Sequence, residues 1–144
     1  MASFLDIVEN HKMVVENSGL LTVAALKHLD VTDKRVVSIL SGGNMDVITM
    51  SSVVQNGLIL RDRIFTVSVL LPDKPGELSK VSATIAKEQG NVIKLEHNQF
   101  VNTNRNAAVE LRITLESFGT DHKKQIIRAL EEDGYKPKVV RTSL

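Results

Sequence analysis

Hydrophobic and polar residues alternate along two segments in the second half of the chain. Every second residue from Phe65 to Leu71 is apolar, and every second residue from Val109 to Leu115 is apolar with charged or hydroxyl residues between. Alternation with a period of two is typical of strands in a sheet with one covered face. The pattern therefore predicts an antiparallel sheet in this half of the chain.

Two helices are predicted between and after these strands. Leu78, Val81 and Ile85 form one apolar stripe at helical spacing, and residues 126–130 contain another. A glycine follows each stripe, at Gly90 and at position 134, as is common at the C-terminal end of a helix.

Two further strands complete the pattern of the second half. Residues 91–100 read as a strand, and residues 135–140 read as a short one that Pro137 restricts to an edge of the sheet. The resulting order is β-α-β-β-α-β, which is that of ferredoxin-like folds. We therefore predict an α+β chain whose residues 63–144 form a ferredoxin-like βαββαβ domain.

Residues 1–62 follow a different pattern. The runs "KMVVE" and "RVVSIL" are apolar without alternation, as in parallel strands covered on both faces. Helices are expected at residues 3–10, 18–29 and 44–55, the last ended by Gly57. Two parallel strands cannot cover three helices, so we interpret residues 1–62 as an α/β remnant of a larger domain. We expect it to be less stable than the remainder, or to bury its apolar surface in another subunit.

Composition excludes several classes of function. Of 144 residues, 42% are hydrophobic, which fits a globular protein, and no cysteine is present for disulfides or thiolate sites. Lys plus Arg number 18 against 17 for Asp plus Glu, so no electrostatic footprint for nucleic acid or an anionic membrane is present. No apolar run approaches the length of a membrane span, and Asp6 and Glu9 do not suit a signal peptide. We expect a cytoplasmic protein.

The second half resembles an ACT domain, a small regulatory module that binds amino acids. The resemblance rests on "LLPDKPGELSKVSATIAKEQGNV", on the "HNQF" strand and on the βαββαβ order. It implies homo-oligomers with an effector, isoleucine or valine, between two such domains. Independently of the resemblance, Pro fixes φ at a helix start, Gly allows close backbone approach, and the first helical amides can bind a carboxylate. The predicted effector site comprises Asp73, Pro75, Gly76, Glu77 and Leu78, with His97 and Asn98 from the strand Leu95–Gln99 of a neighbouring subunit.

The first half resembles the C-terminal end of the catalytic domain of fold-type II pyridoxal-phosphate enzymes. "MVVENSGLLTVAAL" followed by "VVSILSGGNMD" is similar to the threonine ammonia-lyases (threonine dehydratases), in which an ACT domain often follows. The resemblance implies a parent enzyme that converts threonine to 2-oxobutanoate and ammonia for isoleucine synthesis. It implies residues 1–62 as the end of that catalytic domain and residues 63–144 as its ACT regulatory domain.

The turn Ser41-Gly42-Gly43-Asn44 is the predicted cofactor contact. One interpretation is a tight turn that caps a helix. By the resemblance, Ser41 would instead share a hydrogen bond with the pyridine nitrogen of pyridoxal phosphate, with Gly42 and Gly43 beside the cofactor. Glu16 matches a glutamate near the family's cofactor, or only bounds an apolar run. A neutral hydroxyl at that nitrogen makes the ring a weaker electron sink, which suits β-elimination.

A pyridoxal enzyme also needs a lysine for its Schiff base. The family's lysine stands in a serine-phenylalanine-lysine context that no lysine here shares: Lys12 precedes an apolar run and Lys34 sits in a charged turn. The family's phosphate loop is also missing from this sequence. We therefore expect no catalytic residue, no cofactor bound by this chain alone and no threonine deamination by it.

Two other functions stay open from the sequence. The chain is either a non-catalytic oligomerising module or one half of a split pyridoxal-phosphate lyase whose other half is a separate polypeptide. The four histidines show no metal-ligand spacing. His11, His28 and His122 are expected to be solvated, whereas His97 is either a ligand contact or an ordinary sheet residue.

Overall fold

The computed structural model describes residues 2–98 and 108–143. The chain divides into two compact units, Met1–Leu60 and Arg61–Leu144.

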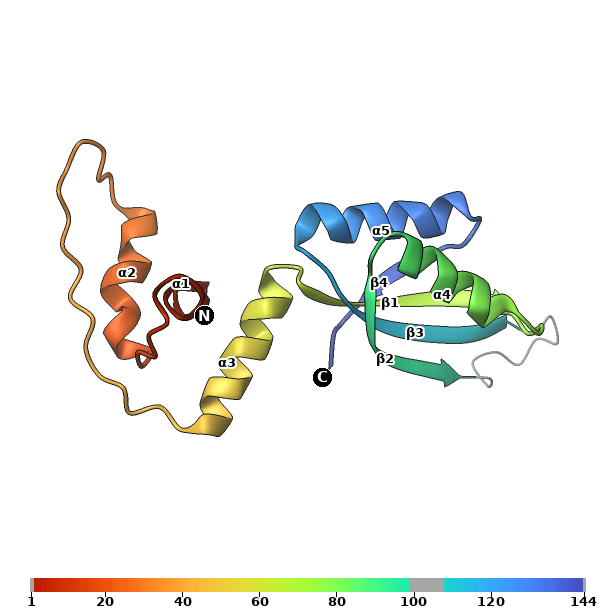
Figure 1. The fold of residues 1–144 in the computed structure, drawn as a ribbon, viewed down its shortest axis with the longest axis horizontal. Helices are drawn as coiled ribbons and strands as arrows, with labels where there is room; N and C mark the ends of the chain where they lie inside the picture. The colour runs from red at the N-terminus through yellow and green to blue at the C-terminus, as the bar shows by residue number, and fades with distance from the viewer. Residues whose placement is uncertain (1, 99–107, 144) are drawn as a thin grey trace. The chain divides into compact units, whose positions relative to one another are not determined.

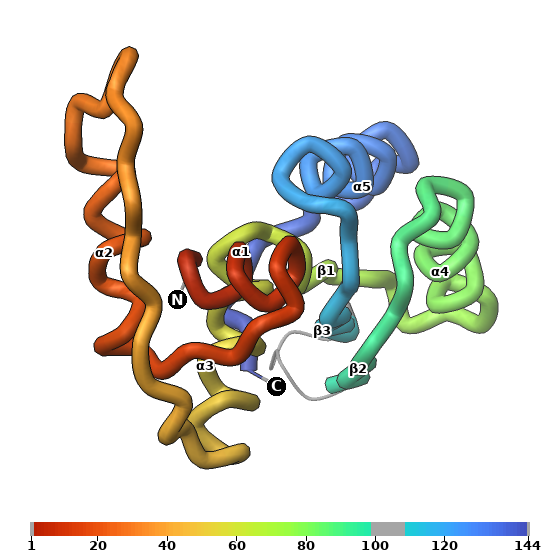
Figure 2. Tube along the Cα trace, turned by 60° about the vertical axis from the view of Figure 1, so that its left-hand side comes forward, coloured from red at the N-terminus to blue at the C-terminus, as the bar shows by residue number. Residues whose placement is uncertain are grey.

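The second unit is built on a four-stranded antiparallel sheet. Its strands are β1 (Ile64–Pro72), β2 (Asn91–Asn98), β3 (Ala108–Glu116) and β4 (Lys138–Val140), in the spatial order β2-β3-β1-β4. Helices α4 (Glu77–Lys87) and α5 (Thr120–Glu132) lie on the same face of the sheet, as Figure 1 and Figure 2 show. The predicted βαββαβ order is confirmed, and Pro137 directly precedes an edge strand.

The core of this unit lies between the sheet and the two helices. In the β1–β3 pairing Val67 is opposite Ile113 and Val69 is opposite Leu111, and all four side chains are fully buried. The helices add buried aliphatic side chains to the same cluster: Val81, Ile85, Ile126 and Leu130. The alternation in the sequence thus identified the covered face, because successive strand residues point to opposite sides of a sheet.

Helix α4 ends somewhat differently from the expectation. The left-handed position is taken by Gln89, with φ 62°, while Gly90 follows it and donates its amide to Ile85 O at 2.9 Å. A Cβ on Gly90 would lie 2.8 Å from Ile85 Cγ2. Glycine at position 90 is therefore needed for close packing on the core, and not for its φ angle.

His122 is not solvated, contrary to the expectation. Its Nδ1 accepts a hydrogen bond from the Phe118 amide at 3.0 Å, and its Nε2 lies 2.6 Å from the carbonyl oxygen of Glu88. The ring also stacks on that of Phe118, with centroids 4.8 Å apart. The arrangement fits a neutral imidazole that accepts at Nδ1 and donates at Nε2. It ties the end of α4 to the start of α5.

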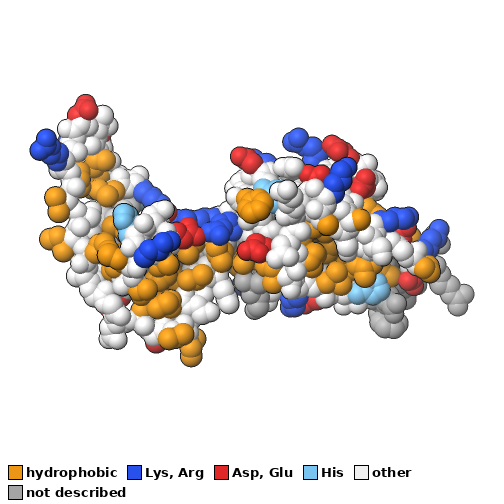
Figure 3. Space-filling view, viewed as in Figure 1, with side chains coloured by type: hydrophobic (Ala, Val, Ile, Leu, Met, Phe, Trp, Pro, Cys, Tyr) orange, Lys and Arg blue, Asp and Glu red, His pale blue; other side chains and the backbone are white. Residues whose placement is uncertain are grey.

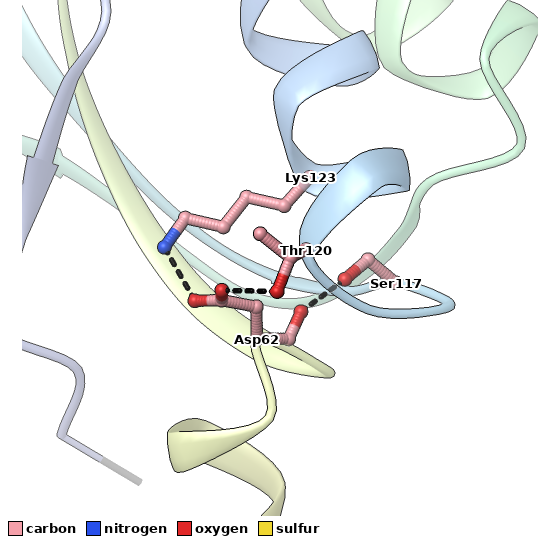
Figure 4. Close-up of polar contacts among 4 residues, drawn as sticks. All are labelled: Asp62, Ser117, Thr120 and Lys123. Carbon is pink, nitrogen blue, oxygen red and sulfur yellow. Dashed lines mark hydrogen bonds and ion pairs between the residues drawn. The ribbon is translucent and has the colours of Figure 1, made fainter.

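Asp62 organises the polar contacts at the start of the second unit (Figure 4). We call Asp62, Ser117, Thr120 and Lys123 the Asp62 cluster. The Asp62 carboxylate accepts hydrogen bonds from Lys123 Nζ at 2.7 Å and from Thr120 Oγ1 at 2.8 Å, and Ser117 Oγ donates to the Asp62 backbone oxygen. The Lys123 ammonium also lies 5.4 Å from the centroid of the Phe65 ring. The hydrogen bond from Lys123, and then that from Thr120, hold the pKa of Asp62 below its ordinary value.

Replacing Asp62 with Asn is expected to lower the free energy of unfolding by about 1–2 kcal/mol at neutral pH. Asn suits the left-handed backbone at this position, where φ is 54°, so the change mainly removes the charge. Because the pKa of Asp62 is lower in the folded state than in the unfolded state, its ionised carboxylate stabilises the fold at pH values above the unfolded-state pKa. This stabilisation is lost as the pH falls through the folded-state pKa. The difference between wild type and variant should therefore be constant from about pH 5 to 7 and shrink below about pH 4.

Urea unfolding followed by the fluorescence of Tyr135, the single tyrosine, measures this difference. Asp121→Asn is the matched control, since Asp121 is fully exposed and its carboxylate lies 3.8 Å from Lys124 Nζ. Asp121→Asn should lower the free energy of unfolding by less than Asp62→Asn does. Equal losses of stability for the two variants, or a difference for Asp62→Asn that does not shrink between pH 5 and pH 2.5, would contradict the role given to the Asp62 cluster.

The first unit is helical in its described residues. It contains α1 (Ala2–His11), a short 3-10 turn η1 (Ser18–Leu20), α2 (Leu21–Ala25), a second 3-10 turn η2 (Leu26–His28) and α3 (Val47–Leu60). Its core is a small cluster: Phe4, Ile7, Val15, Leu20 and Val53.

The two apolar runs of the first unit are not strands, contrary to the expectation. "KMVVE" and "RVVSIL" are both without regular secondary structure, and the Glu16 amide donates to Gly42 O at 3.1 Å beside them. A strand needs a ladder of hydrogen bonds to a neighbour, and parallel strands need both faces covered. The local pattern indicated a strand, but the described residues of this unit contain no sheet that either run joins.

Gly57 does not end α3, which continues to Leu60. Gly57 is buried within the helix, and a Cβ on it would lie 2.7 Å from Leu5 Cδ1. The glycine therefore lets α1 pack closely on α3. In the sequence, a glycine after an apolar stripe looks the same whether it ends a helix or allows two helices to cross closely.

Large apolar side chains are exposed on the first unit. Val37 is 88% exposed and Ile48 is 81% exposed, and Figure 3 shows hydrophobic side chains gathered on the face of this unit that is in view. These β-branched residues are of the kind that strands bury. Exposed apolar side chains gathered on one face commonly lie in contacts with other protein surface.

Candidate functional site

The predicted cofactor residues Glu16 and Gly42 lie together. The Glu16 amide donates to Gly42 O at 3.1 Å, and the Glu16 carboxylate accepts from Ser18 Oγ at 2.7 Å. Gly42 has φ 80°, and a Cβ there would lie 2.4 Å from the Glu16 carboxyl carbon. The positive φ strains any residue with a Cβ, and the end of the Glu16 side chain would also have to move aside.

Gly19 is a further residue of this cluster, which the sequence reasoning missed. A Cβ on Gly19 would lie 1.7 Å from the backbone oxygen of Ser41. Gly19 therefore allows the segment after Glu16 to pass directly against the turn at Ser41. The only signal in the sequence is a glycine at the start of an apolar helical segment, where it reads as an ordinary helix start.

The residues present do not form a cradle for pyridoxal phosphate. The space beside Gly19 and Gly42 is filled by the chain's own Ser41 and Glu16, so these glycines serve close packing between two segments. The three lysine amino groups of residues 1–60 also have other partners: Glu9 O for Lys12, Asp6 for Lys27 and Asp30 O for Lys34.

The predicted effector turn joins β1 to α4. Asp73, Pro75 and Gly76 are exposed, the Lys74 amide donates to Pro72 O at 2.8 Å, and Gly76 caps the helix with φ 91°. The Glu77 amide donates to Lys74 O at 3.4 Å. The amides that follow it in the first turn of the helix have no partner one turn back, and their dipoles favour an anion. Leu78, 40% exposed, stands in the first turn of the helix beside this position.

Glu77 has a structural role in this turn. Its carboxylate accepts from Lys80 Nζ at 2.7 Å and also lies near Tyr135. The hydrogen bond with Glu77 raises the pKa of Lys80, whereas desolvation and then the Glu77 charge raise the pKa of the Tyr135 phenol. Glu77 thus ties the start of α4 to the segment after α5, and its carboxylate already has partners.

His97 and Asn98 do not face the same side of the sheet. His97 is opposite Leu111, a core residue, so it belongs to the side covered by the helices, although it is itself exposed at the edge. Asn98 is opposite Glu110, and a hydrogen bond from Asn98 contributes to the lowered pKa of that carboxyl, whose largest cause is the bond from Ser68. Of the two residues, only His97 shares a side of the sheet with α4. Gln99, the last residue of the predicted strand, lies outside the described residues.

A substitution of Gly76 does not test this site cleanly. A Cβ at Gly76 would meet nothing within 4 Å, so a side chain there fits the available space. The φ of 91° is nevertheless one that residues with a Cβ rarely adopt, and a larger residue would strain the turn itself. Leu78 offers a better position for an experiment, because it is exposed and its backbone is helical.

Within residues 2–98 and 108–143, no helix combines the length and apolar character that crossing a bilayer requires. Within the same residues, no group of three or more His, Asp or Glu side chains has an arrangement that could hold a metal ion.

The chain is similar over almost its whole length to curated threonine ammonia-lyases. The L-threonine ammonia-lyase of Geobacter sulfurreducens is 34% identical over 137 residues, which are 94% of this chain and 34% of the relative. That of Thermotoga maritima is 30% identical over 139 residues, which are 96% of this chain and 35% of the relative. The chain thus spans about a third of the length of these relatives. No protein-family profile matches it.

An ACT domain is among the solved structures similar to the chain. Prephenate dehydratase from Streptococcus mutans is 22% identical with a TM-score of 0.45, over 53% of this chain and 40% of that one. The ACT domain of prephenate dehydrogenase from Bacillus anthracis is 22% identical with a TM-score of 0.40, over 51% of this chain and 99% of that one. By sequence, the chain is a homologue of the C-terminal part of the L-threonine ammonia-lyases.

Proposed function

We propose that this chain is the regulatory C-terminal part of a threonine ammonia-lyase and that its residues 63–144 are an ACT domain that binds an effector amino acid. Residues 1–62 would be the end of the parent enzyme's pyridoxal-phosphate domain. The observation that carries the proposal is the exposed turn Asp73–Gly76 at the start of α4, in a chain that is homologous to these enzymes over 94% of its length.

The geometry of the turn suits the carboxylate of an amino acid. Helix α4 has eleven residues, and the amides that follow Glu77 in its first turn offer hydrogen bonds to an anion. Leu78 adds an exposed aliphatic side chain in the same turn. An amino acid with a branched aliphatic side chain, isoleucine or valine, would satisfy both features.

A second copy of the chain would complete the site. β2 is an edge strand of the sheet, and Leu95 and His97 on the helix-covered side of it are exposed. An edge strand presents unpaired backbone groups that favour pairing with another chain. Two copies side by side would place Leu95 and His97 of one next to the helix turn of the other, so we propose a homo-oligomer with the effector between its subunits.

Calorimetric titration of isoleucine and of valine into the chain tests this function. Leu78→Ser should weaken binding by about tenfold, because it removes roughly half of a leucine's apolar contact. Leu70→Ser is the matched control: Leu70 is also a partly exposed leucine, but it lies in β1 opposite Glu110 on the other face of the sheet. Equal affinity of wild type and Leu78→Ser would place the effector elsewhere, and the absence of binding by the wild type would leave an oligomerising module.

The second candidate function is one half of a split lyase. It is favoured by the exposed apolar residues of the first unit, such as Val37 and Ile48. An aldimine absorbance band with pyridoxal phosphate that needs a second polypeptide, covering the rest of a relative, distinguishes it. This readout is independent of the amino-acid titration.

A further inference from the structure

The face of the sheet opposite the helices carries a polar hollow. Its cavity has a volume of about 230 Å³, and every strand of the second unit contributes to it. The lining residues are Thr66, Lys94, Glu96, Arg112, Thr114, Val140, Arg141 and Ser143. Val140 is the only aliphatic side chain among them, so the hollow does not suit the branched aliphatic amino acid proposed above.

The floor of the hollow is formed by two buried threonines. Thr66 and Thr114 are 6% and 4% exposed, and their hydroxyl oxygens lie 2.9 Å apart in a mutual hydrogen bond. Only one of the two hydroxyl protons is used in that bond, so the pair keeps one donor and spare acceptor positions. Buried hydroxyls are usually satisfied by a partner, and this pair leaves capacity for a polar ligand above it.

Three cationic side chains line the hollow, two from strands β2 and β3 and one from the segment after β4. Lys94 Nζ lies 2.8 Å from Glu96 Oε1, and Arg112 Nε lies 3.1 Å from Glu110 Oε1. The contact of Arg112 uses Nε, and its other guanidinium N–H groups remain as donors. Arg141, just after β4, has no hydrogen bond or ion pair with any residue that the structure describes. Lys94 and Arg112 each have a carboxylate partner. Among the described residues, the charge of Arg141 is therefore the one in the hollow that no ion pair balances.

We propose that this hollow binds a small polar oxyanion, a carboxylate or a phosphate, through Arg141 and Arg112 above the Thr66–Thr114 floor. A planar guanidinium presents paired donors that match the oxygens of either group. The volume corresponds to about eight water molecules, which suits a ligand of a few heavy atoms. The site is on the opposite face of the sheet from the effector turn and does not depend on the proposed function.

Calorimetric titrations of malate and of inorganic phosphate into the full chain, each at constant ionic strength, test the site and distinguish the two anions. The variant Arg141→Gln should weaken binding by about 10- to 100-fold, as expected for the loss of charge-assisted hydrogen bonds. Arg141 is exposed and has no partner in the described residues, so the fold should tolerate the change. Arg128→Gln on α5 is the control, with the same change of net charge at an exposed position on the helices.

Two outcomes would overturn the proposal. In one, neither malate nor phosphate binds the wild-type chain at millimolar concentration. In the other, Arg141→Gln and Arg128→Gln weaken binding equally, which indicates a general response to net charge. Binding of only one of the two anions, weakened by Arg141→Gln alone, supports the site and identifies its chemistry.

Discussion

Replacing Gly19 with alanine is expected to disrupt the packing of the first unit. The added Cβ would lie 1.7 Å from the backbone oxygen of Ser41, and a backbone atom cannot move aside as a flexible side chain can. The segment after Glu16 and the turn at Ser41 would have to separate, which breaks the bond from the Glu16 amide to Gly42 O. We expect a loss of about 2–3 kcal/mol, which is large for a unit of 60 residues with a small core.

Hydrogen exchange of the Glu16 amide, followed by mass spectrometry of residues 12–20, measures this effect. Gly43→Ala is the matched control, because a Cβ on Gly43 would meet only Val14 O at 3.9 Å, an ordinary contact. Gly43→Ala should leave the exchange of this segment unchanged, and Gly19→Ala should remove its protection. The same protection in both variants would contradict the close contact between Gly19 and Ser41.

The largest effect in the second unit is expected from Leu111→Ala. Leu111 is fully buried at the centre of β3, opposite Val69 of β1 and His97 of β2. Removing its side chain leaves a cavity between the sheet and the helices, and such changes cost about 3 kcal/mol. Urea unfolding followed by Tyr135 fluorescence reports on this unit, because the only tyrosine of the chain lies within it.

Leu70→Ala in the neighbouring strand provides the comparison. Leu70 is 48% exposed and stands opposite Glu110, on the face without helices. We expect a cost below about 1 kcal/mol, since about half of the side chain is already in water. Similar costs for Leu111→Ala and Leu70→Ala would mean that the helix-covered face is not the core of this unit.

The sequence by itself determined the fold of the second unit. Alternation along Phe65–Leu71 and Val109–Leu115 identified the face that the helices cover, and the helical stripes placed α4 and α5 correctly. These features are local, because each depends only on which side of a strand or helix must leave water. The turn before α4 was predictable for the same reason, since Pro75 and Gly76 carry their backbone preferences with them.

Only the tertiary structure decided the features that depend on distant partners. The run "RVVSIL" has the composition of a buried strand, but in the described residues no neighbour supplies its ladder, and it is not a strand. Gly57 and Gly19 read as helix punctuation, whereas Leu5 and the Ser41 backbone fix their true roles in packing. His97 and Asn98 are adjacent in sequence, yet the register of β2 against β3 places them on opposite faces. The polar hollow beside Arg141 likewise depends on the order β2-β3-β1-β4, which brings Lys94, Arg112 and Arg141 to one face of the sheet.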